Sequence, residues 1–570
     1  MKLLFRDYLA SLRERGELDA VLPDLLSELG YTVYSRPQRG TAQAGVDIAA
    51  IGRGEGEERK VYLFSVKQGD LTRQSWDGNP QALRSSLNEI RDSYIPARIP
   101  KAFEKLRVVI CLVFGGDMQE QVRPAVTGYM AENTTDRIGF EEWNGDKLAG
   151  LLLQGILREE IMPKETRSHF QKAVAMVDEP DIATEHFGRL VHELTHSINN
   201  DRTRLRVVRQ LYIALWVLFV WARDAKNVEA PYRASEIVLL NIWNLLRPYI
   251  GTKRNPVSKA ITEVFHYTIQ LHISIAAELL ERKILPHAGV RDGISLAVWT
   301  RTHVDVNLKL FDLLGRIAMM ALWIHWWSLR DTDEERKKTV QDQVSKWAMM
   351  IFQLINNNRA LFLPLQDQAA IEIGLFLVLL GIAVSNTEDL RAWLHEMTER
   401  LVLTVQTHGK YPCVFTEYHQ LVDHPRERTE EYRQEATAGS ILIPLLAAFL
   451  SALGQSEELE SLVQLTSNEL KHCTLQLWLP DAATEDRIYV GGRDHGLELC
   501  DLPLTSSGEE LINTIRKACE DSSDFANLSA IATDYWPVLL MACRHYRFPV
   551  PPQFWIHLIS DPVGETPAAA

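Results

Sequence analysis

Residues 45–70, GVDIAAIGRGEGEERKVYLFSVKQGD, decide how the amino-terminal part of the chain folds. Two apolar runs flank the glycine-rich segment 52–58, a pattern that predicts a β-hairpin with a long turn. With the turn centred near Glu57, we expect Asp47 to lie opposite Lys67. Period-two alternation then places the odd-numbered residues of the second strand, including Ser65, on the same face as Lys67. The hairpin therefore predicts a carboxylate and an ammonium at one end, with a hydroxyl two residues along.

Strand and helix patterns alternate around this hairpin throughout residues 1–163. The expected strands are 31–35, 46–51, 60–66, 106–114 and 138–142. The expected helices are 17–29, 79–94, 119–130 and one that begins at Asp146. This order predicts an α/β domain over residues 1–163.

The rest of the chain has helical periodicity almost throughout. We expect a helical domain over 164–400 and a mainly helical carboxy-terminal domain over 401–570. Within the latter, the polar segment 407–435 is predicted to be a loop, and 490–507 to hold short strands. The chain is thus expected to combine an α/β domain with a large all-α region.

Charge and composition exclude some classes of protein. Among 570 residues, 61 Lys and Arg oppose 75 Asp and Glu, for a net charge of −14. A protein that coats nucleic acid with its whole surface would be basic, so any nucleic-acid contact here must be a local patch. Residues 1–100 hold 14 basic and 14 acidic residues, so the remainder carries the whole excess of negative charge.

Neither a membrane span nor a secretory signal is expected. The longest apolar runs, 211–222 and 373–384, have 12 residues each, whereas a span needs about 20. We interpret both runs as buried core helices. The six cysteines form no CxxC pair, which favours a reducing compartment and predicts a cytoplasmic protein.

Five segments, in this order, resemble the PD-(D/E)xK nuclease superfamily, and within it the Mrr-type restriction endonuclease-like group. They are LDAVLPDLLSELGY, GVDI, FSVK, LRVVICLVF and GFEEWNGDKLAGLL, and the resemblance covers about residues 18–157. It implies a restriction-endonuclease-like fold with a mixed sheet.

The resemblance also implies roles for particular side chains. Asp47 resembles the metal-binding aspartate, and Lys67 the lysine that positions the attacking water and stabilises charge on the phosphate. Asp19 matches an acid of the first helix that completes the metal site. Ser65 departs from the family, which has Glu or Gln at that position. Asp70, just beyond the strand, is a candidate third carboxylate.

The residue types suit metal-dependent phosphodiester hydrolysis. A hard cation, Mg²⁺ or Mn²⁺, prefers oxygen ligands and lowers the pKa of its bound water. Arg36, Arg39 and Arg73 are candidate nucleic-acid contacts. The predicted function is cleavage of DNA, with RNA left open, by an effector of a prokaryotic anti-phage defence or restriction system. The helical region would sense a trigger, bind a protein partner or form a homo-oligomer.

Two other classes of function remain open. Ser65 would fit a catalytically degenerate nuclease fold that only binds nucleic acid or a protein. His192, Glu193 and His196 spell HExxH, the motif of zinc metallopeptidases, in a predicted helix. His408, Cys413, His419 and His424 match no common zinc-module spacing and are interpreted as loop residues.

Overall fold

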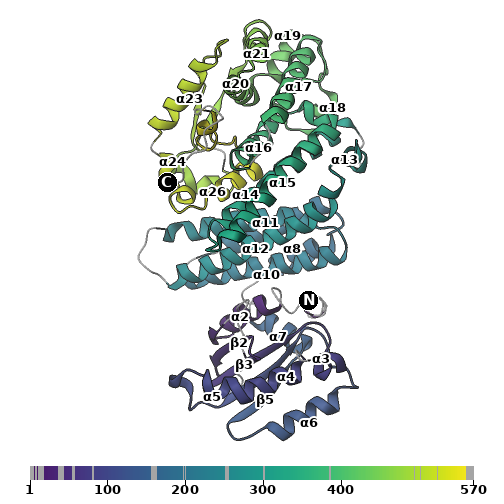
Figure 1. Ribbon diagram of the computed structural model, residues 1–570, viewed down its shortest axis with the longest axis vertical. Coiled ribbons are helices and arrows are strands. Elements are labelled where there is room, and N and C mark those ends of the chain that lie inside the picture. The colour runs from purple at the N-terminus through teal and green to yellow at the C-terminus, as the bar shows by residue number, and fades with distance from the viewer. Residues whose placement is uncertain are drawn as a thin grey trace. The chain divides into compact units, whose positions relative to one another are not determined.

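The computed structural model describes residues 6, 9, 18–35, 44–53, 58–79, 82–155, 164–196, 198, 200–250, 256–298, 302–383, 387–492, 495–500, 502–522 and 524–559. The chain divides into two compact units, residues 1–238 with 256–268 and residues 239–255 with 269–570. A mixed five-stranded sheet lies near the amino terminus, and a large helical region follows (Figure 1). This layout confirms the predicted succession of an α/β part and a helical part.

The sheet has the strand order β1-β2-β3-β4-β5. Its strands are β1 (Thr32–Ser35), β2 (Ile48–Gly52), β3 (Lys60–Lys67), β4 (Val108–Phe114) and β5 (Ile138–Trp143). The first three pair antiparallel, whereas β3 pairs parallel with β4 and β4 parallel with β5. The three central strands are almost wholly buried, which explains their continuous apolar runs. All five strands were expected from the sequence.

One face of the sheet packs against helices that follow β3 and β4. These are α3 (Arg73–Asp77), α4 (Leu83–Glu89), the π-helix η2 (Ile90–Tyr94) and α6 (Arg123–Asn133). Val61 and Leu63 of β3 share a core with Trp76, Leu87 and Val126 of these helices. Short turns at Ile95–Ala97 (α5) and Lys101–Phe103 (η3) lead from η2 toward β4.

The other face of the sheet carries an aromatic cluster. Tyr62 and Phe64 of β3 stack with ring centroids 6.3 Å apart. Trp143 meets Phe64 edge to face at 5.1 Å, and Tyr31 meets Tyr62 in the same way. The helices α2 (Asp19–Glu28) and α7 (Gly145–Gly155) contact each other and the strands of this side. Residues of β3 therefore alternate between two cores, as the sequence predicted.

Three long helices follow the sheet in the described part of the first unit. They are α8 (Lys164–Ala175), α9 (Pro180–His196) and α10 (Asp201–Asp224), which all contact one another. The first parts of α11 (Glu229–Leu246) and α12 (Pro256–Lys283) also belong to this unit. Among the described residues, α10 alone has the length and apolar composition to cross a membrane, but 83% of its apolar window is buried. It is a core helix, as predicted for the run 211–222.

The second unit is organised around α14 (His303–Ser328), which contacts α15 (Glu334–Asn357), α16 (Ala370–Ile382) and α26 (Trp536–Tyr546). Its other helices include α13 (Gly293–Ala297), α17 (Thr387–Gln406), α18 (Tyr418–Asp423), α19 (Glu430–Ala436), α20 (Leu442–Ala452), α21 (Ser456–Asn468), α22 (Glu485–Ile488), α23 (Glu509–Asp521), α24 (Asp524–Asn527) and α25 (Ser529–Ala532). Two small sheets pair β6 (Gly439–Ser440) with β7 (Thr474–Leu475) and β8 (Leu477–Leu479) with β9 (Leu497–Leu499). The expected strand within 490–507 is therefore present, but the prediction of a loop over 407–435 is wrong where α18 and α19 form.

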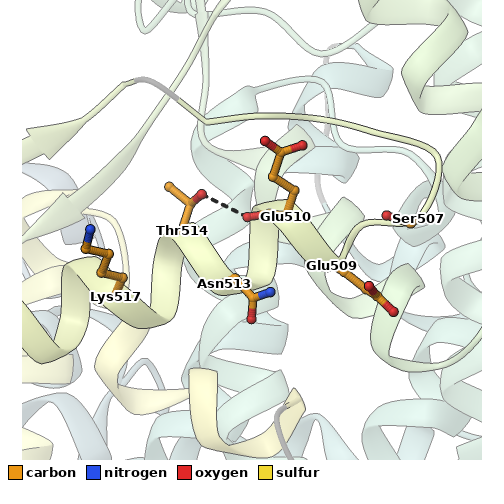
Figure 2. Close-up of a pocket in the computed structure, with 6 residues that line it drawn as sticks. All are labelled: Ser507, Glu509, Glu510, Asn513, Thr514 and Lys517. Carbon is orange, nitrogen blue, oxygen red and sulfur yellow. Dashed lines mark hydrogen bonds between the residues drawn. The ribbon is translucent and has the colours of Figure 1, made fainter.

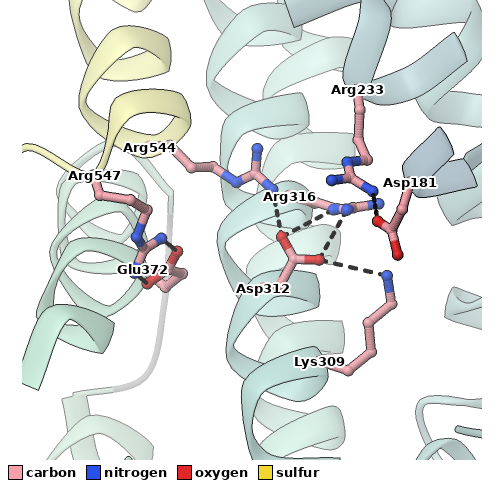
Figure 3. A network of polar contacts seen from close by, with 8 residues as sticks. All are labelled: Asp181, Arg233, Lys309, Asp312, Arg316, Glu372, Arg544 and Arg547. Carbon is pink, nitrogen blue, oxygen red and sulfur yellow. Dashed lines mark hydrogen bonds and ion pairs between the residues drawn. The ribbon is translucent and has the colours of Figure 1, made fainter. Parts of the chain in front are cut away.

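A charged network ties the central helices of this unit together (Figure 3). Asp312 of α14 accepts hydrogen bonds from Arg316 at 3.0 Å and from Arg544 of α26 at 2.6 Å, and Lys309 lies 3.5 Å away. Burial opposes ionisation of Asp312, but the two guanidinium groups outweigh it and hold the pKa of this carboxyl well below its usual range. Both arginine side chains are buried, so the network depends on the carboxylate for charge balance.

Candidate functional site

The register of the β2–β3 hairpin differs from the expected one. Ile48 pairs with Phe64 and Gly52 pairs with Lys60, so the midpoint is residue 56 and not 57. The predicted pairing of Asp47 with Lys67 is therefore wrong: Asp47 directly precedes β2, and its amide bonds the carbonyl of Phe64, the residue that pairs with Ile48. A shift of two residues preserves the face of each side chain, because the pleat has a period of two. Ser65 and Lys67 therefore share one face of β3 as expected, and Asp47 lies beside this end of the strand through its bond to the Val66 amide.

The Asp47 carboxylate is held by the backbone of the neighbouring strand. Its Oδ2 accepts a hydrogen bond from the Val66 amide at 2.7 Å, and its own amide donates to the Phe64 carbonyl at 2.9 Å. Asp47 and Lys67 are both half-buried. The carboxylate therefore has a defined position at the end of the strand pair where Lys67 emerges.

A tight turn before β2 sets the direction in which Asp47 enters the sheet. Ala44 and Gly45 both have positive φ, 50° and 78°. A Cβ atom on Gly45 would lie 2.1 Å from the Ser86 carbonyl oxygen of α4. Only glycine fits this position, because the backbone is left-handed and the space is already filled. The AGVD segment thus presses against α4 and delivers Asp47 to the site.

Ser65 contributes a buried hydroxyl between the two charged residues. The residue is 1% exposed, and its Oγ has no hydrogen-bond partner in the described part of the chain. Ser65 pairs with Leu112 of β4, and Val113 and Phe114 beyond it are buried as well. A buried hydroxyl without a partner costs free energy of folding.

The loops that follow β3 and β4 form the rim of the site. The Gly116 amide donates to the Gly69 carbonyl at 2.9 Å, and the Gly145 amide donates to the Gly116 carbonyl at 2.9 Å. Asp70, the candidate third carboxylate, is exposed and accepts a hydrogen bond from the Asp117 amide at 2.8 Å. This bond holds the two loops together.

The other predicted site residues are placed only in part. Asp19 begins α2, but its side chain lies outside the described residues, as do Arg36 and Arg39. Arg73 is the exposed first residue of α3, which is capped by Thr72 at the carboxyl end of β3. The described residues therefore bring together Asp47, Ser65 and Lys67, and place Arg73 a few residues beyond them in the chain.

The HExxH motif lies on α9 as expected. His192 and His196 are exposed, with ring centroids 5.6 Å apart. Glu193 instead faces α8, where its carboxylate accepts a hydrogen bond from Thr166 at 2.7 Å and lies 3.6 Å from His169. In the described ranges, no group of three His, Cys, Asp or Glu side chains is arranged to hold a metal. The zinc-peptidase hypothesis thus lacks a third ligand there.

His424 lies in a loop between α18 and α19, as expected, but its side chain is buried in the core. It is 2% exposed, and its ring nitrogens lie 3.0 Å from the Tyr432 hydroxyl and 3.0 Å from the Tyr411 carbonyl oxygen. Burial lowers the pKa of His424 to about 4. A neutral ring that donates to the carbonyl and accepts from the hydroxyl satisfies both nitrogens, so this histidine stabilises the fold.

A shallow groove in the second unit runs along α23, far along the chain from these residues (Figure 2). It is lined by Ser507, Glu509, Glu510, Asn513, Thr514 and Lys517, and the Thr514 hydroxyl donates to the Glu510 carbonyl at 2.8 Å. The lining offers two carboxylates and one ammonium without a buried reactive group. It adds nothing to the chemistry of the hairpin end.

Comparison with known proteins yields no relative. The chain matches no family model, no curated protein and no solved structure. Function is therefore inferred from the hairpin end, where the Asp47 carboxylate is bonded to the amide between Ser65 and Lys67. Those groups can bind a hard cation and an anionic substrate side by side.

Proposed function

We propose that the α/β part of this chain is a metal-dependent nuclease that hydrolyses phosphodiester bonds of DNA. The observation that carries the proposal is the Asp47 carboxylate bonded to the Val66 amide, which lies between Ser65 and Lys67 at the carboxyl end of β3. A carboxylate beside a lysine is suited to a reaction in which negative charge develops on a phosphate.

The sheet supports the resemblance to restriction-endonuclease-like proteins. A mixed five-stranded sheet begins with an antiparallel hairpin and continues with two parallel strands. The FSVK segment lies on a central strand and GVDI on its antiparallel neighbour, as the resemblance implies. The fold assignment within that superfamily is part of the proposal.

The donor set fits a hard divalent cation. Asp47 would hold Mg²⁺ or Mn²⁺, with Asp19 as a second acid, since oxygen ligands are the ones these cations prefer. The buried Ser65 hydroxyl, which has no partner in the described chain, would bind one water molecule in place of the usual Glu or Gln. When bound, the cation supplies Lewis acidity and a more acidic water.

The chain's own groups would divide the remaining work. The Lys67 ammonium would stabilise charge that accumulates on the phosphate oxygens, a contribution that grows when water is excluded. The Val66 amide holds the Asp47 carboxylate in place at 2.7 Å, so no reorganisation is needed when substrate binds. Arg73 would contact the phosphate backbone beyond the site.

The large helical region is proposed to sense a trigger, to bind a protein partner or to form a homo-oligomer. This assignment follows from architecture by analogy, as for an effector of a prokaryotic anti-phage defence or restriction system. The second unit contributes no catalytic group to the proposed reaction.

One specific observation favours a second candidate. Ser65 brings no charge to a position where the resembling family has Glu or Gln, which would fit a nuclease fold that binds nucleic acid without cleaving it. The two candidates differ in whether the purified protein hydrolyses DNA.

Plasmid cleavage with Mg²⁺ or Mn²⁺ tests the proposal. We expect Asp47→Asn and Lys67→Met to lower the cleavage rate by roughly 100-fold or more, the usual effect of removing an electrostatic catalytic group. Asp92→Asn and Lys172→Met change two exposed residues elsewhere in the first unit and serve as controls with wild-type rates. Equal cleavage by all five proteins would overturn the site. Binding without cleavage by the wild type would favour the second candidate.

A further inference from the structure

A row of cations crosses the sheet at the end opposite the candidate site. Lys60, Arg107 and Arg137 are the residues at, or directly before, the starts of β3, β4 and β5. The Val61 amide donates to the Arg107 carbonyl and the Val108 amide donates to the Arg137 carbonyl, both at 2.9 Å. The backbone pairing thus aligns the three residues across adjacent strands, which lie about 4.8 Å apart.

Two further arginines extend this row. Arg59 precedes Lys60, and Arg53 follows Gly52, the β2 residue that pairs with Lys60. We call Arg53, Arg59, Lys60, Arg107 and Arg137 the basic edge. All four arginines are exposed and Lys60 is half-buried.

The positive charge of the basic edge is not balanced by ion pairs. In the described ranges, no carboxylate lies within 4.0 Å of a charged nitrogen of these five residues. Arg137 donates to the backbone carbonyl of Glu104 at 2.8 Å, a contact that orients the guanidinium and leaves its charge in place. The segment before β4 adds Arg98, Lys101 and Lys105, all exposed.

Acidic residues are fewer than basic residues at this end of the sheet. The described ones are Glu58, Glu104 and Asp136, against the eight cations of the basic edge and the segment before β4. Glu55 and Glu57 lie outside the described residues. The chain as a whole has a net charge of −14. The cations gathered at this end of the sheet therefore create a local positive potential on a negatively charged protein.

Two of the cations belong to residues that the pairing of β4 with β5 places side by side. The Arg107 guanidinium extends over β5, since a Cβ on Gly139 would be 3.5 Å from its Nη2. Gly139 is the second residue of β5, and Arg137 directly precedes that strand. Like charges on neighbouring strands repel, and an anion between them would relieve the repulsion.

We propose that the basic edge binds the phosphate backbone of a nucleic-acid duplex. Cations on adjacent strands are about 4.8 Å apart, so a row of them can follow closely spaced phosphates. Each exposed arginine can donate two hydrogen bonds to one phosphate. Among the described aromatic residues, Tyr31 lies beside this row, but its ring is half-buried against Gly52 and Tyr62. The exposed groups of the row are therefore charged, which favours contact with the backbone of a duplex over stacking with unpaired bases. The contact would be independent of nucleotide sequence.

This contact is separate from the proposed catalytic site. The eight residues of β3 span roughly 23 Å at about 3.3 Å per residue. The basic edge would therefore hold a different segment of nucleic acid, or a different molecule, from the one at Lys67. The inference stands whether or not the chain cleaves DNA.

Fluorescence anisotropy with a 30-base-pair duplex in EDTA, across a salt series, tests the inference on the full chain. We expect Arg107→Gln with Arg137→Gln to weaken binding by roughly 10-fold or more at 100 mM salt, and to reduce the salt slope by about 2. The matched control Arg123→Gln with Arg189→Gln makes the same charge change at exposed arginines paired with Glu120 and Glu185. Its affinity is expected to remain that of the wild type.

The outcomes separate the two proposals. Unchanged affinity and salt slope in the Arg107 and Arg137 variant, with unchanged circular dichroism, would overturn the basic edge. Binding to vesicles of anionic lipid but not to the duplex would overturn it as well. Asp47→Asn is expected to retain duplex affinity. If Asp47→Asn cleaves normally while the edge variant loses binding, the catalytic proposal fails and the basic edge stands.

Discussion

Replacing Ser65 by alanine should stabilise the sheet and slow the proposed reaction at the same time. The Ser65 hydroxyl is buried and has no hydrogen-bond partner in the described chain. An unsatisfied buried hydroxyl costs roughly 1–3 kcal/mol, whereas alanine removes a single oxygen atom and a few packing contacts. We therefore expect Ser65→Ala to raise the free energy of unfolding of the α/β part by about 1 kcal/mol.

Hydrogen exchange of the β3 amides, followed by mass spectrometry, measures this change locally. A global melting curve would mix the two compact units, for which a single transition is not expected. A gain of 1 kcal/mol corresponds to roughly fivefold slower exchange through the open state. In the same protein we expect slower plasmid cleavage, so stability and activity would move in opposite directions.

Ser235→Ala is the matched control, because it removes the same atom from an equally buried serine. The Ser235 hydroxyl donates to the Tyr232 carbonyl at 2.6 Å, so its loss should destabilise α11 by about 1 kcal/mol. If Ser65→Ala accelerates exchange in β3 as Ser235→Ala does in α11, the Ser65 hydroxyl has a partner within the protein. The reasoning that links it to an external ligand would then be refuted.

Three further substitutions and conditions test the structure. Gly45→Ala should destabilise the α/β part by roughly 2–4 kcal/mol, from a left-handed backbone and a Cβ contact with a carbonyl oxygen, measured by hydrogen exchange of β2. Asp312→Asn should cost roughly 3–5 kcal/mol in urea unfolding of the second unit, because it removes the carboxylate that the buried Arg316 and Arg544 share. His424 has a folded pKa of about 4, below its unfolded value of about 6.5. Its contribution is therefore complete above pH 6.5 and declines by up to about 3 kcal/mol as the pH falls from about 6.5 to 4.

Each of these expectations has a contrasting measurement. Gly128→Ala, in α6 with open space around the new Cβ, should stabilise by about 0.5–1 kcal/mol, and an equal response to Gly45→Ala would contradict the turn geometry. Arg282→Gln breaks an exposed ion pair with Glu278 and should cost under about 0.5 kcal/mol. If Asp312→Asn also lowered the free energy of unfolding by less than about 0.5 kcal/mol, the network around Asp312 would not be needed for stability. His424→Gln should flatten the pH dependence, and an unchanged slope would assign it to other groups.

The sequence predicted the sheet well because its strands are short apolar runs separated by clear breaks. β4 is buried at all seven positions, and such a run is too short and too rich in branched residues for most helices. The register of the hairpin was harder to predict from the sequence. The seven residues 53–59 between β2 and β3 contain several residues that tolerate a turn, so the midpoint could be displaced by one residue, which moves every cross-strand pair by two.

Tertiary context decided what the sequence could not show. Helix α8 is polar along most of its length, and it was not expected because its buried face is narrow. His424 was assigned to a loop from its polar neighbours, whereas Tyr411 and Tyr432 enclose it from other segments. The basic edge also escaped notice, although a basic residue stands at the start of β3 and directly before β4 and β5. A pattern of that kind acquires meaning only once parallel pairing aligns the three strands.

The parallel pairing of β3 with β4 also bears on the order in which the two surfaces can form during synthesis. Asp47, Ser65 and Lys67 belong to one local hairpin, so they can meet as soon as residue 70 has left the ribosome. Lys60, Arg107 and Arg137 align only after β4 and β5 have been added in register. A nascent chain would thus acquire its reactive end well before its cationic end. Because only the finished sheet presents that row, bound duplex should raise the melting temperature of this part at low salt.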